Sequence, residues 1–201
     1  MLFDYQAGSF FQNNNSVLVP LTSYVRDAIF PSTSASSTPP PTHLVDAYCG
    51  AGLFALTLAS HFTQVAGIEL SADSIRFATH NAALNDLAHK ASFRTGDAAQ
   101  IFSAVGDFPS ALTALVVDPP RKGCDEAFIR QLLAFRAQTV VYVSCNVHTQ
   151  ARDVGQIVSW SAEEAADGKR EGKYVLESLR GFDLFPQTGH VESVAVLRLV
   201  S

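Results

Sequence analysis

Apolar positions along the chain follow two patterns, one helical and one extended. From Ser16 to Phe30 they recur at helical spacing, which predicts a helix with Ser16 as its N-cap. Beyond residue 43, short apolar runs alternate with amphipathic segments. The apolar runs predict seven strands, at residues 44–48, 64–69, 92–94, 113–118, 139–143, 174–182 and 193–200. The amphipathic segments predict helices at residues 52–60, 73–85, 125–134 and 149–160.

Strands that alternate with helices are typical of an α/β fold, with one mostly parallel sheet and helices on both faces. Residues 31–42 are rich in Pro, Ser and Thr and predict a flexible loop. Residues 161–173 are charged and contain glycine, which predicts an exposed loop. We therefore expect residues 1–30 to form an N-terminal segment and helix, and residues 43–201 to form the core of the same domain.

Composition narrows the classes of protein to consider. The chain has 201 residues, of which 47% are apolar and 16% charged, and its net charge is −5. This charge is unlike that of a basic nucleic-acid-binding surface, so any nucleic acid must be bound locally or through another domain. No run reaches the roughly 18 apolar residues of a membrane span, and the N-terminus resembles no signal peptide. Three cysteines without paired or metal-type spacing predict a reducing intracellular compartment and no metal site.

A glycine turn is predicted where the first strand meets the next helix, in the run Asp46-Ala47-Tyr48-Cys49-Gly50-Ala51-Gly52. Glycines there let the backbone approach a ligand closely. The third glycine of a dinucleotide fingerprint and the Lys of a triphosphate loop are both missing. Glu69 ends the next strand, where a carboxylate can accept the two hydroxyls of a ribose. Asp97 follows the third strand and is placed to meet an adenine amino group.

A second group of polar residues follows the later strands. Cys145 comes directly after the run 139–143, and Asp118-Pro119-Pro120-Arg121 follows the run 113–117. The carboxyl ends of parallel strands line the ligand crevice, so these side chains should converge there. Glu192 precedes the last strand and is a candidate to join them. Thiol, acid and a nucleotide-type cofactor together suggest covalent catalysis. The alternatives are a small core residue for Cys145 and a solvated acid for Glu192.

Five motifs occur in an order that resembles the RNA uracil-C5 methyltransferase family, which makes 5-methyluridine in tRNA or ribosomal RNA. The resemblance extends from about Ser9 to Leu197. It rests on Ser9-Phe10-Phe11-Gln12-Asn13-Asn14, Asp46-Ala47-Tyr48-Cys49-Gly50, Asp118-Pro119-Pro120-Arg121-Lys122-Gly123, Val143-Ser144-Cys145-Asn146 and His190-Val191-Glu192.

The resemblance implies a Rossmann-like class I fold and S-adenosylmethionine as cofactor. It implies that Cys145 is the nucleophile, adding to C6 of uracil, and that Glu192 is the general base. Arg121 is either a substrate contact or a cation that favours the thiolate, and Asn146 is a candidate substrate contact. The residues expected to bind the cofactor are Gln12, Tyr48, Gly50, Gly52, Glu69, Asp97 and Asp118.

The chain also departs from the family pattern. Many bacterial members have Gly-x-Gly-Asn where this chain has Leu53 after its second glycine, which removes one polar contact to the cofactor. Family members usually carry an RNA-binding β-barrel and a central domain, and neither is recognised in these 201 residues. We therefore expect a monomer that binds cofactor well and RNA weakly, with a tRNA T-loop uridine favoured over ribosomal RNA.

Other classes fit the residues less well. Methyltransferases that act on amino groups need an aromatic residue at the position of Arg121, and their chemistry needs no counterpart of Cys145. RNA cytosine-C5 methyltransferases carry a cysteine after Asp-x-Pro, which Asp118-Pro119-Pro120 lacks. A cofactor- or RNA-binding module without turnover remains an alternative, and substitution of Cys145 distinguishes it from an enzyme.

Overall fold

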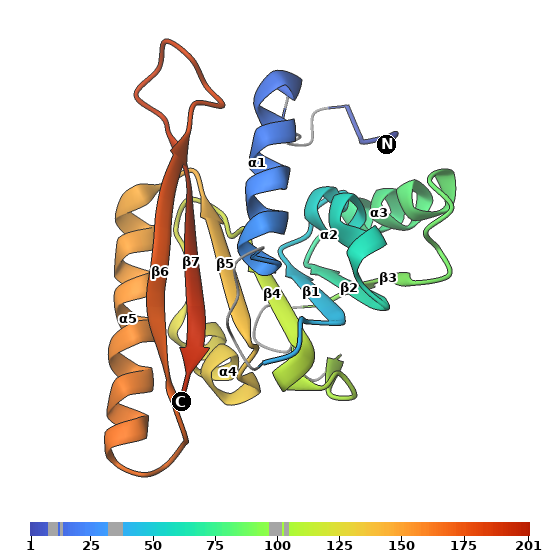
Figure 1. Cartoon of the computed structure of the whole chain (residues 1–201). Helices are drawn as coiled ribbons and strands as arrows, with labels where there is room; N and C mark the ends of the chain where they lie inside the picture. The colour runs from blue at the N-terminus through green and yellow to red at the C-terminus, as the bar shows by residue number, and fades with distance from the viewer. Residues whose placement is uncertain (8–11, 13, 32–37, 97–101, 103–104) are drawn as a thin grey trace.

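The computed structural model contains one seven-stranded sheet, with strand order β3-β2-β1-β4-β5-β7-β6 (Figure 1). The structure describes residues 1–7, 12, 14–31, 38–96, 102 and 105–201. The strands are β1 (His43–Ala47), β2 (Gln64–Glu69), β3 (Ala91–Thr95), β4 (Thr113–Val117), β5 (Thr139–Ser144), β6 (Lys173–Phe182) and β7 (Glu192–Val200). β1 to β5 are parallel, whereas β7 runs antiparallel to both β5 and β6. The predicted seven-stranded α/β sheet is thus confirmed.

Helices cover both faces of the sheet. They are α1 (Asn15–Ile29), α2 (Leu53–Leu58), α3 (Ala72–Leu84), α4 (Glu126–Phe135) and α5 (Val147–Ala166), with short 3-10 turns at Ala59–His61 and Ser110–Leu112. One apolar core lies under α1, α2 and α3, and a second lies under α4 and α5. Strand β5 serves both cores, because Val141 and Val143 face the first while Val140 and Tyr142 face the second. Burial on both faces explains its uninterrupted apolar run.

The topology defines where a ligand site belongs. Strand β1 pairs with β2 on one side and with β4 on the other, so the chain changes direction across the sheet at this point. Ligands of open α/β sheets bind beyond the carboxyl ends of the strands at such a switch point. The glycine turn follows β1 and the Asp118 segment follows β4. Both therefore meet at the switch point.

Helix α5 is longer than the sequence pattern predicts. It spans Val147–Ala166, so residues 161–166 are helical and the prediction of a loop from 161 to 173 is wrong for them. The added turn is held by tertiary contacts: the Ser161 hydroxyl accepts a hydrogen bond from the Tyr174 amide at 3.0 Å, and Glu164 pairs with Arg170 at 2.9 Å. Periodicity within the segment does not reveal these contacts.

Helix α1 begins two residues earlier than predicted: its first residue is Asn15, and its N-cap is Asn14 rather than Ser16. Ser16 lies inside the helix, where its hydroxyl donates to the side-chain oxygen of Asn14 at 2.6 Å. Of the predicted loop at 31–42, residues 32–37 lie outside the described part of the chain. Within the described residues, no helix has the length and apolar character needed to cross a bilayer.

Candidate active site

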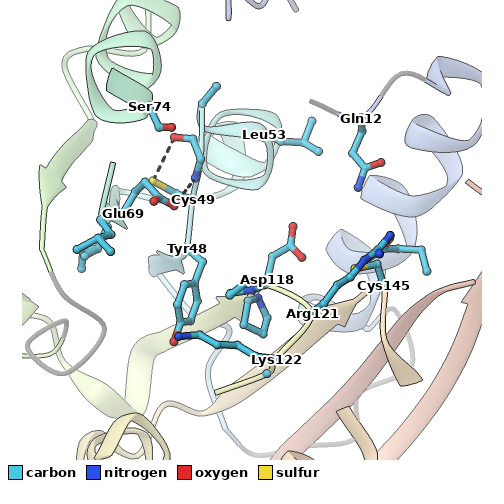
Figure 2. Close-up of a pocket in the computed structure, with 18 of the residues that line it drawn as sticks. Gln12, Tyr48, Cys49, Leu53, Glu69, Ser74, Asp118, Arg121, Lys122 and Cys145 are labelled. Carbon is cyan, nitrogen blue, oxygen red and sulfur yellow. Dashed lines mark hydrogen bonds between the residues drawn. The ribbon is translucent and has the colours of Figure 1, made fainter. Parts of the chain in front are cut away.

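A cavity of about 730 Å³ lies beyond the carboxyl ends of β1, β2, β4 and β5 (Figure 2). This volume is typical of small-molecule sites. The structure brings to its wall eight of the residues that the sequence singled out: Gln12, Tyr48, Gly50, Glu69, Asp118, Arg121, Cys145 and Glu192. Leu53, which occupies the position of the family's Asn, also lines the cavity. Asp97 lies outside the described residues, and Gly52 and Asn146 are not part of the wall.

The glycine turn after β1 is built on left-handed backbone. Tyr48, Gly50 and Gly52 have φ values of 62°, 52° and 94°. Gly52 is the N-cap of α2, and a Cβ there would lie 3.2–3.3 Å from Leu56 and Phe93 side-chain atoms. The sequence predicts Gly52 among the residues that bind the cofactor. In the structure it shapes the turn and does not line the cavity. The turn aims the Gly50 amide toward β2.

The carboxylate of Glu69 is held at the end of β2 by two backbone amides. Gly50 donates to one oxygen at 3.3 Å, and Ser71 donates to the other at 3.0 Å. Figure 2 shows Glu69 beside Cys49 on one side of the cavity, while Gln12 lies on the opposite side. One carboxylate thus joins the two turns that follow β1 and β2, and its role as an acceptor of ribose hydroxyls stays a prediction.

A second carboxyl group, that of Asp46, ties the strand before the turn to the helix after it. Asp46 is completely buried, and one of its oxygens accepts the Ala55 amide of α2 at 2.7 Å. Its other oxygen has no hydrogen-bond partner among the described residues. Burial raises the pKa of Asp46 to about 7, against the stabilising bond from Ala55, and the charge of Glu69 adds to the increase. The carboxyl group is thus poised between its charged and neutral forms.

Asp118 lies on the segment that leaves β4. Its amide donates to the Ala47 carbonyl at 3.2 Å, so the segment continues the pairing of β4 with β1. Burial raises the pKa of Asp118 well above its usual range, and the charges of Glu192 and Asp46 raise it further. In Figure 2 its carboxyl group points into the cavity between Tyr48 and Arg121. The site therefore gathers acidic groups around a shared space.

Cys145 follows β5 directly, before the N-cap of α5 at Asn146. It is half-buried, whereas Cys49 and Cys124 are buried, so it is not a core residue of the kind the alternative interpretation required. Burial and then the Glu192 charge raise the pKa of the Cys145 thiol; a hydrogen bond and the charge from Arg121 oppose this, and Asp118 adds a smaller increase. The expected cation is therefore in place, but burial and the nearby acids outweigh its effect on the pKa.

Glu192 is the first residue of β7 and lies on the wall of the same cavity. Its exposed fraction is only 1%, which excludes a solvated acid. One of its carboxyl oxygens has no hydrogen-bond partner within the described part of the chain. Burial raises the pKa of Glu192 to about 7. A carboxyl group with this pKa in a cavity can accept or release a proton near neutral pH.

The side chain of Asn146 is used within the protein. Its nitrogen donates to the Arg121 carbonyl at 3.0 Å, and its oxygen accepts the His148 amide at 3.1 Å. Because the side chain is engaged in these two bonds, a direct substrate contact by Asn146 stays a prediction. His190 is exposed, and its ring meets Phe185 edge-on at 6.3 Å between centroids.

Sequence reasoning missed several residues at the site. Phe185 and Lys122 line the cavity, and a buried carboxylate, Asp153, lies behind it. For Phe185 the sequence carried no signal beyond its nearness to His190. For Asp153 a signal existed, because helical spacing places it on the buried stripe of α5 that contains Val154 and Ile157. A charged residue at such a position is rarely buried unless it is paired.

Comparison with known proteins agrees with this geometry. A family model described as tRNA (Uracil-5-)-methyltransferase matches residues 1–199. The tRNA (uracil(54)-C(5))-methyltransferase of Schizosaccharomyces pombe is 47% identical over 199 residues, which is 98% of this chain and 36% of that protein. The protein of the same name from Saccharomyces cerevisiae is 44% identical over 198 residues, covering 98% of this chain and 29% of that protein. The chain thus spans about a third of the length of these relatives.

A solved structure supports the fold. The crystal structure of Pyrococcus abyssi tRNA (uracil-54, C5)-methyltransferase, in complex with S-adenosyl-L-homocysteine, matches with a TM-score of 0.72 at 28% identity. The match covers 94% of this chain and 40% of that one. The fold is therefore that of the class I S-adenosylmethionine-dependent methyltransferases, as the resemblance implied. Together with the family match over nearly the whole chain, this shows that the chain belongs to the tRNA (uracil-5-)-methyltransferase family.

Proposed function

We propose that this chain catalyses S-adenosylmethionine-dependent methylation of uracil C5 in tRNA, at the T-loop uridine corresponding to position 54. The observation that carries the proposal is that Cys145, Arg121 and Glu192 share one cavity with Glu69 and the glycine turn. A nucleophile, a base and a cofactor position are thus combined in one space. The names of the two yeast relatives favour tRNA over ribosomal RNA.

The charges of the cavity suit S-adenosylmethionine. Asp46 and Glu192 are buried and Asp118 is half-buried; all three carboxyl groups have raised pKa values, and their mutual repulsion contributes to the increase for Asp118. A ligand with a positive charge would relieve this repulsion. Glu69 offers its carboxylate to ribose hydroxyls, and Asp118 is placed to face the cationic part of the ligand. Bound there, S-adenosylmethionine supplies an electrophilic methyl group on a sulfonium.

The residues of the chain account for the remaining chemistry. Uracil C5 is a poor nucleophile until the Cys145 thiolate adds to C6, which moves an electron pair through C5 to the C4 oxygen. The electron pair then returns through C5, which takes the methyl group as the S–CH3 bond breaks. Glu192 removes the proton from C5, the Sγ–C6 bond breaks and the thiolate is regenerated. Protons, methyl group and electron pairs balance without a further reactant.

The electrostatics of the site fit this sequence of steps. Glu192 with a pKa of about 7 accepts a proton near neutral pH. Arg121 is the positively charged group placed to favour the Cys145 thiolate. A binding module without turnover would need neither a half-buried thiol nor a buried acid with an unpartnered oxygen. We therefore favour an enzyme over such a module.

The test is covalent trapping. The protein is incubated with S-adenosylmethionine and an excess of T-arm RNA that carries 5-fluorouridine at the target position, and its intact mass is measured. Fluorine cannot leave as a cation, so the methylated adduct on Cys145 should persist. The expected result is a protein–RNA adduct in the wild type and none in Cys145→Ala or with cytidine at the target. Absence of adduct in the wild type, with cofactor binding confirmed by calorimetry, would contradict the proposal.

A further inference from the structure

Residues at the start and along one face of helix α5 donate hydrogen bonds to the backbone of the segment Asp118–Gly123. Asn146 and Thr149 both donate to the Arg121 carbonyl, at 3.0 and 3.1 Å. Arg152 donates to the carbonyls of Lys122 at 2.9 Å and Cys124 at 3.2 Å. Residues 146, 149 and 153 are three or four positions apart and so share one side of the helix. The helix thus fixes the backbone of the segment that carries Asp118 and Arg121.

Asp153 is the centre of this arrangement. Its side chain is completely buried, and one oxygen accepts the Cys124 amide at 2.7 Å and the Tyr142 hydroxyl at 2.6 Å. The other oxygen accepts from the Arg152 guanidinium at 2.8 Å. A buried carboxylate is tolerated only with such pairing. Its partners come from three places: the segment after β4, strand β5 and helix α5 itself.

Gly123 shows how closely the segment packs on this carboxylate. Its φ is +77°, and a Cβ at this position would lie 2.5 Å from the Asp153 oxygen. The Cys124 thiol lies 3.6 Å from the Tyr142 hydroxyl. Burial raises the pKa of Cys124 to about 12 and also raises that of Tyr142, so both groups stay neutral. The segment therefore packs against a buried carboxyl group that is surrounded by hydrogen-bond donors.

We propose that Asp153 is a positioning residue for the Cys145 thiol, acting through the segment Asp118–Gly123 and the guanidinium of Arg121. The inference rests on the proposed function, because it assigns Asp153 a part in preparing the nucleophile. Asp153 is not among the residues that line the cavity, so it acts through the segment. The described charged groups that face Cys145 are Arg121 and Asp118 from this segment and Glu192 from β7. Arg121 alone among these three favours the thiolate.

The test measures the reactivity of Cys145 without RNA or cofactor. Wild type and Asp153→Asn are treated with iodoacetamide between pH 6 and pH 10, and alkylation of the tryptic peptide 137–152 is followed by mass spectrometry. This peptide contains Cys145 as its single cysteine. Displacement of Arg121 should raise the pKa of the thiol. We expect alkylation about tenfold slower at pH 7, and a difference that narrows as the pH rises past the pKa of the wild-type thiol.

Two further variants and one control complete the design. Glu163→Gln makes the same kind of change at an exposed position of α5 and should leave the profile unchanged. Tyr142→Phe removes one donor to Asp153 and should shift the profile less than Asp153→Asn. Arg152→Gln removes the bonds to the Lys122 and Cys124 carbonyls at a half-exposed side chain, so it provides the test if Asp153→Asn does not fold. Because this change removes a trypsin site, peptide 137–169, which also has Cys145 as its single cysteine, is followed for this variant.

The outcomes separate positioning from stability and from the proposed function. Circular dichroism and thermal unfolding establish that each variant is folded. A folded Asp153→Asn protein with a lower Tm but an unchanged alkylation profile would overturn the inference, since Asp153 would then only stabilise the fold. The same holds for Arg152→Gln. Failure of the wild type to trap fluorinated RNA would contradict the proposed function and leave the alkylation result unaffected.

Discussion

The two halves of the sheet contribute to the cavity in different ways. On the side of β1 and β2, the Glu69 carboxylate is held by two backbone amides, and the turn beside it depends on left-handed glycines. On the side of β4, β5 and β7, Glu192 has an oxygen without a partner, and burial raises the pKa of Asp118 and of Cys145. Within the described residues, Asp46 on the first side also has an unpartnered oxygen and a raised pKa, but it does not line the cavity. Among the described carboxyl groups on the wall, the first side therefore offers a hydrogen-bonded carboxylate, and the second offers one with a raised pKa and a free oxygen.

The largest expected effect is on turnover, and it should distinguish the two cysteines on the cavity wall, Cys145 and Cys49. Cys145→Ser should lower kcat for T-arm RNA by about a thousandfold or more, because a hydroxyl is a far weaker nucleophile toward C6. Cys49→Ser is the matched control on the β1 side: burial raises the pKa of its thiol well above the usual range, and the proposed mechanism gives it no role. Transfer of labelled methyl groups measures both. Equal losses would remove the distinction between the two sides.

The next effect concerns how the free energy of unfolding depends on pH through Glu192. Glu192 has a pKa of about 7 when folded, above the 4.5 of the free side chain. Between these values the native state retains a proton that the unfolded state releases, so Glu192 makes stability fall as pH rises from about 4.5 to 7. Glu192→Gln removes this dependence. The difference in free energy of unfolding between Glu192→Gln and wild type should therefore move by about 2–3 kcal/mol in favour of the variant between pH 4 and pH 8.

Urea unfolding at the two pH values measures this gain. Asp73→Asn on the surface of α3 serves as the control, because the Asp73 side chain is 61% exposed and its ion pair with Arg76, at 3.3 Å, lies in solvent. A difference between Glu192→Gln and wild type that stays constant with pH would show that the native carboxyl group titrates normally.

A smaller effect is expected on the binding side. Glu69→Gln should weaken S-adenosylhomocysteine binding about tenfold, because one charged acceptor for ribose hydroxyls is replaced by a neutral amide. Its kcat at saturating cofactor should change little, since Glu69 takes no part in the chemical steps. Calorimetry and steady-state kinetics measure the two values. A loss of kcat with unchanged affinity would place Glu69 on the catalytic side.

The smallest effect tests the backbone of the glycine turn. Gly52→Ala places a side chain at φ 94° against Leu56 and Phe93, and should destabilise the fold by about 1–2 kcal/mol. Gly155→Ala in α5 meets no atom within 4 Å and should stabilise the fold by about 0.5–1 kcal/mol. Thermal unfolding compares them. Equal Tm values for the two variants would show that the turn is not under conformational constraint.

Local patterns in the sequence predicted most of the fold. Strands β4 and β5 are recognisable because they are buried on both faces and so consist almost entirely of apolar residues. The errors lie at helix ends: α5 continues to Ala166 and α1 takes Asn14 as its N-cap. Helix ends depend on contacts such as that of Ser161 with Tyr174, which join residues distant in the chain.

The sequence by itself determined at which edge of the sheet the main acidic groups and the thiol lie. Strand ends place Glu69, Asp118 and Cys145 at one edge, because parallel strands share a direction. Only the tertiary structure decided their electrostatic state. The pKa of Glu192 rises because burial removes water from its carboxyl group, and the buried Asp153 carboxyl group is tolerated because the segment after β4, strand β5 and its neighbour Arg152 supply donors. Burial and pairing are properties of the packed molecule, so no local pattern contains them.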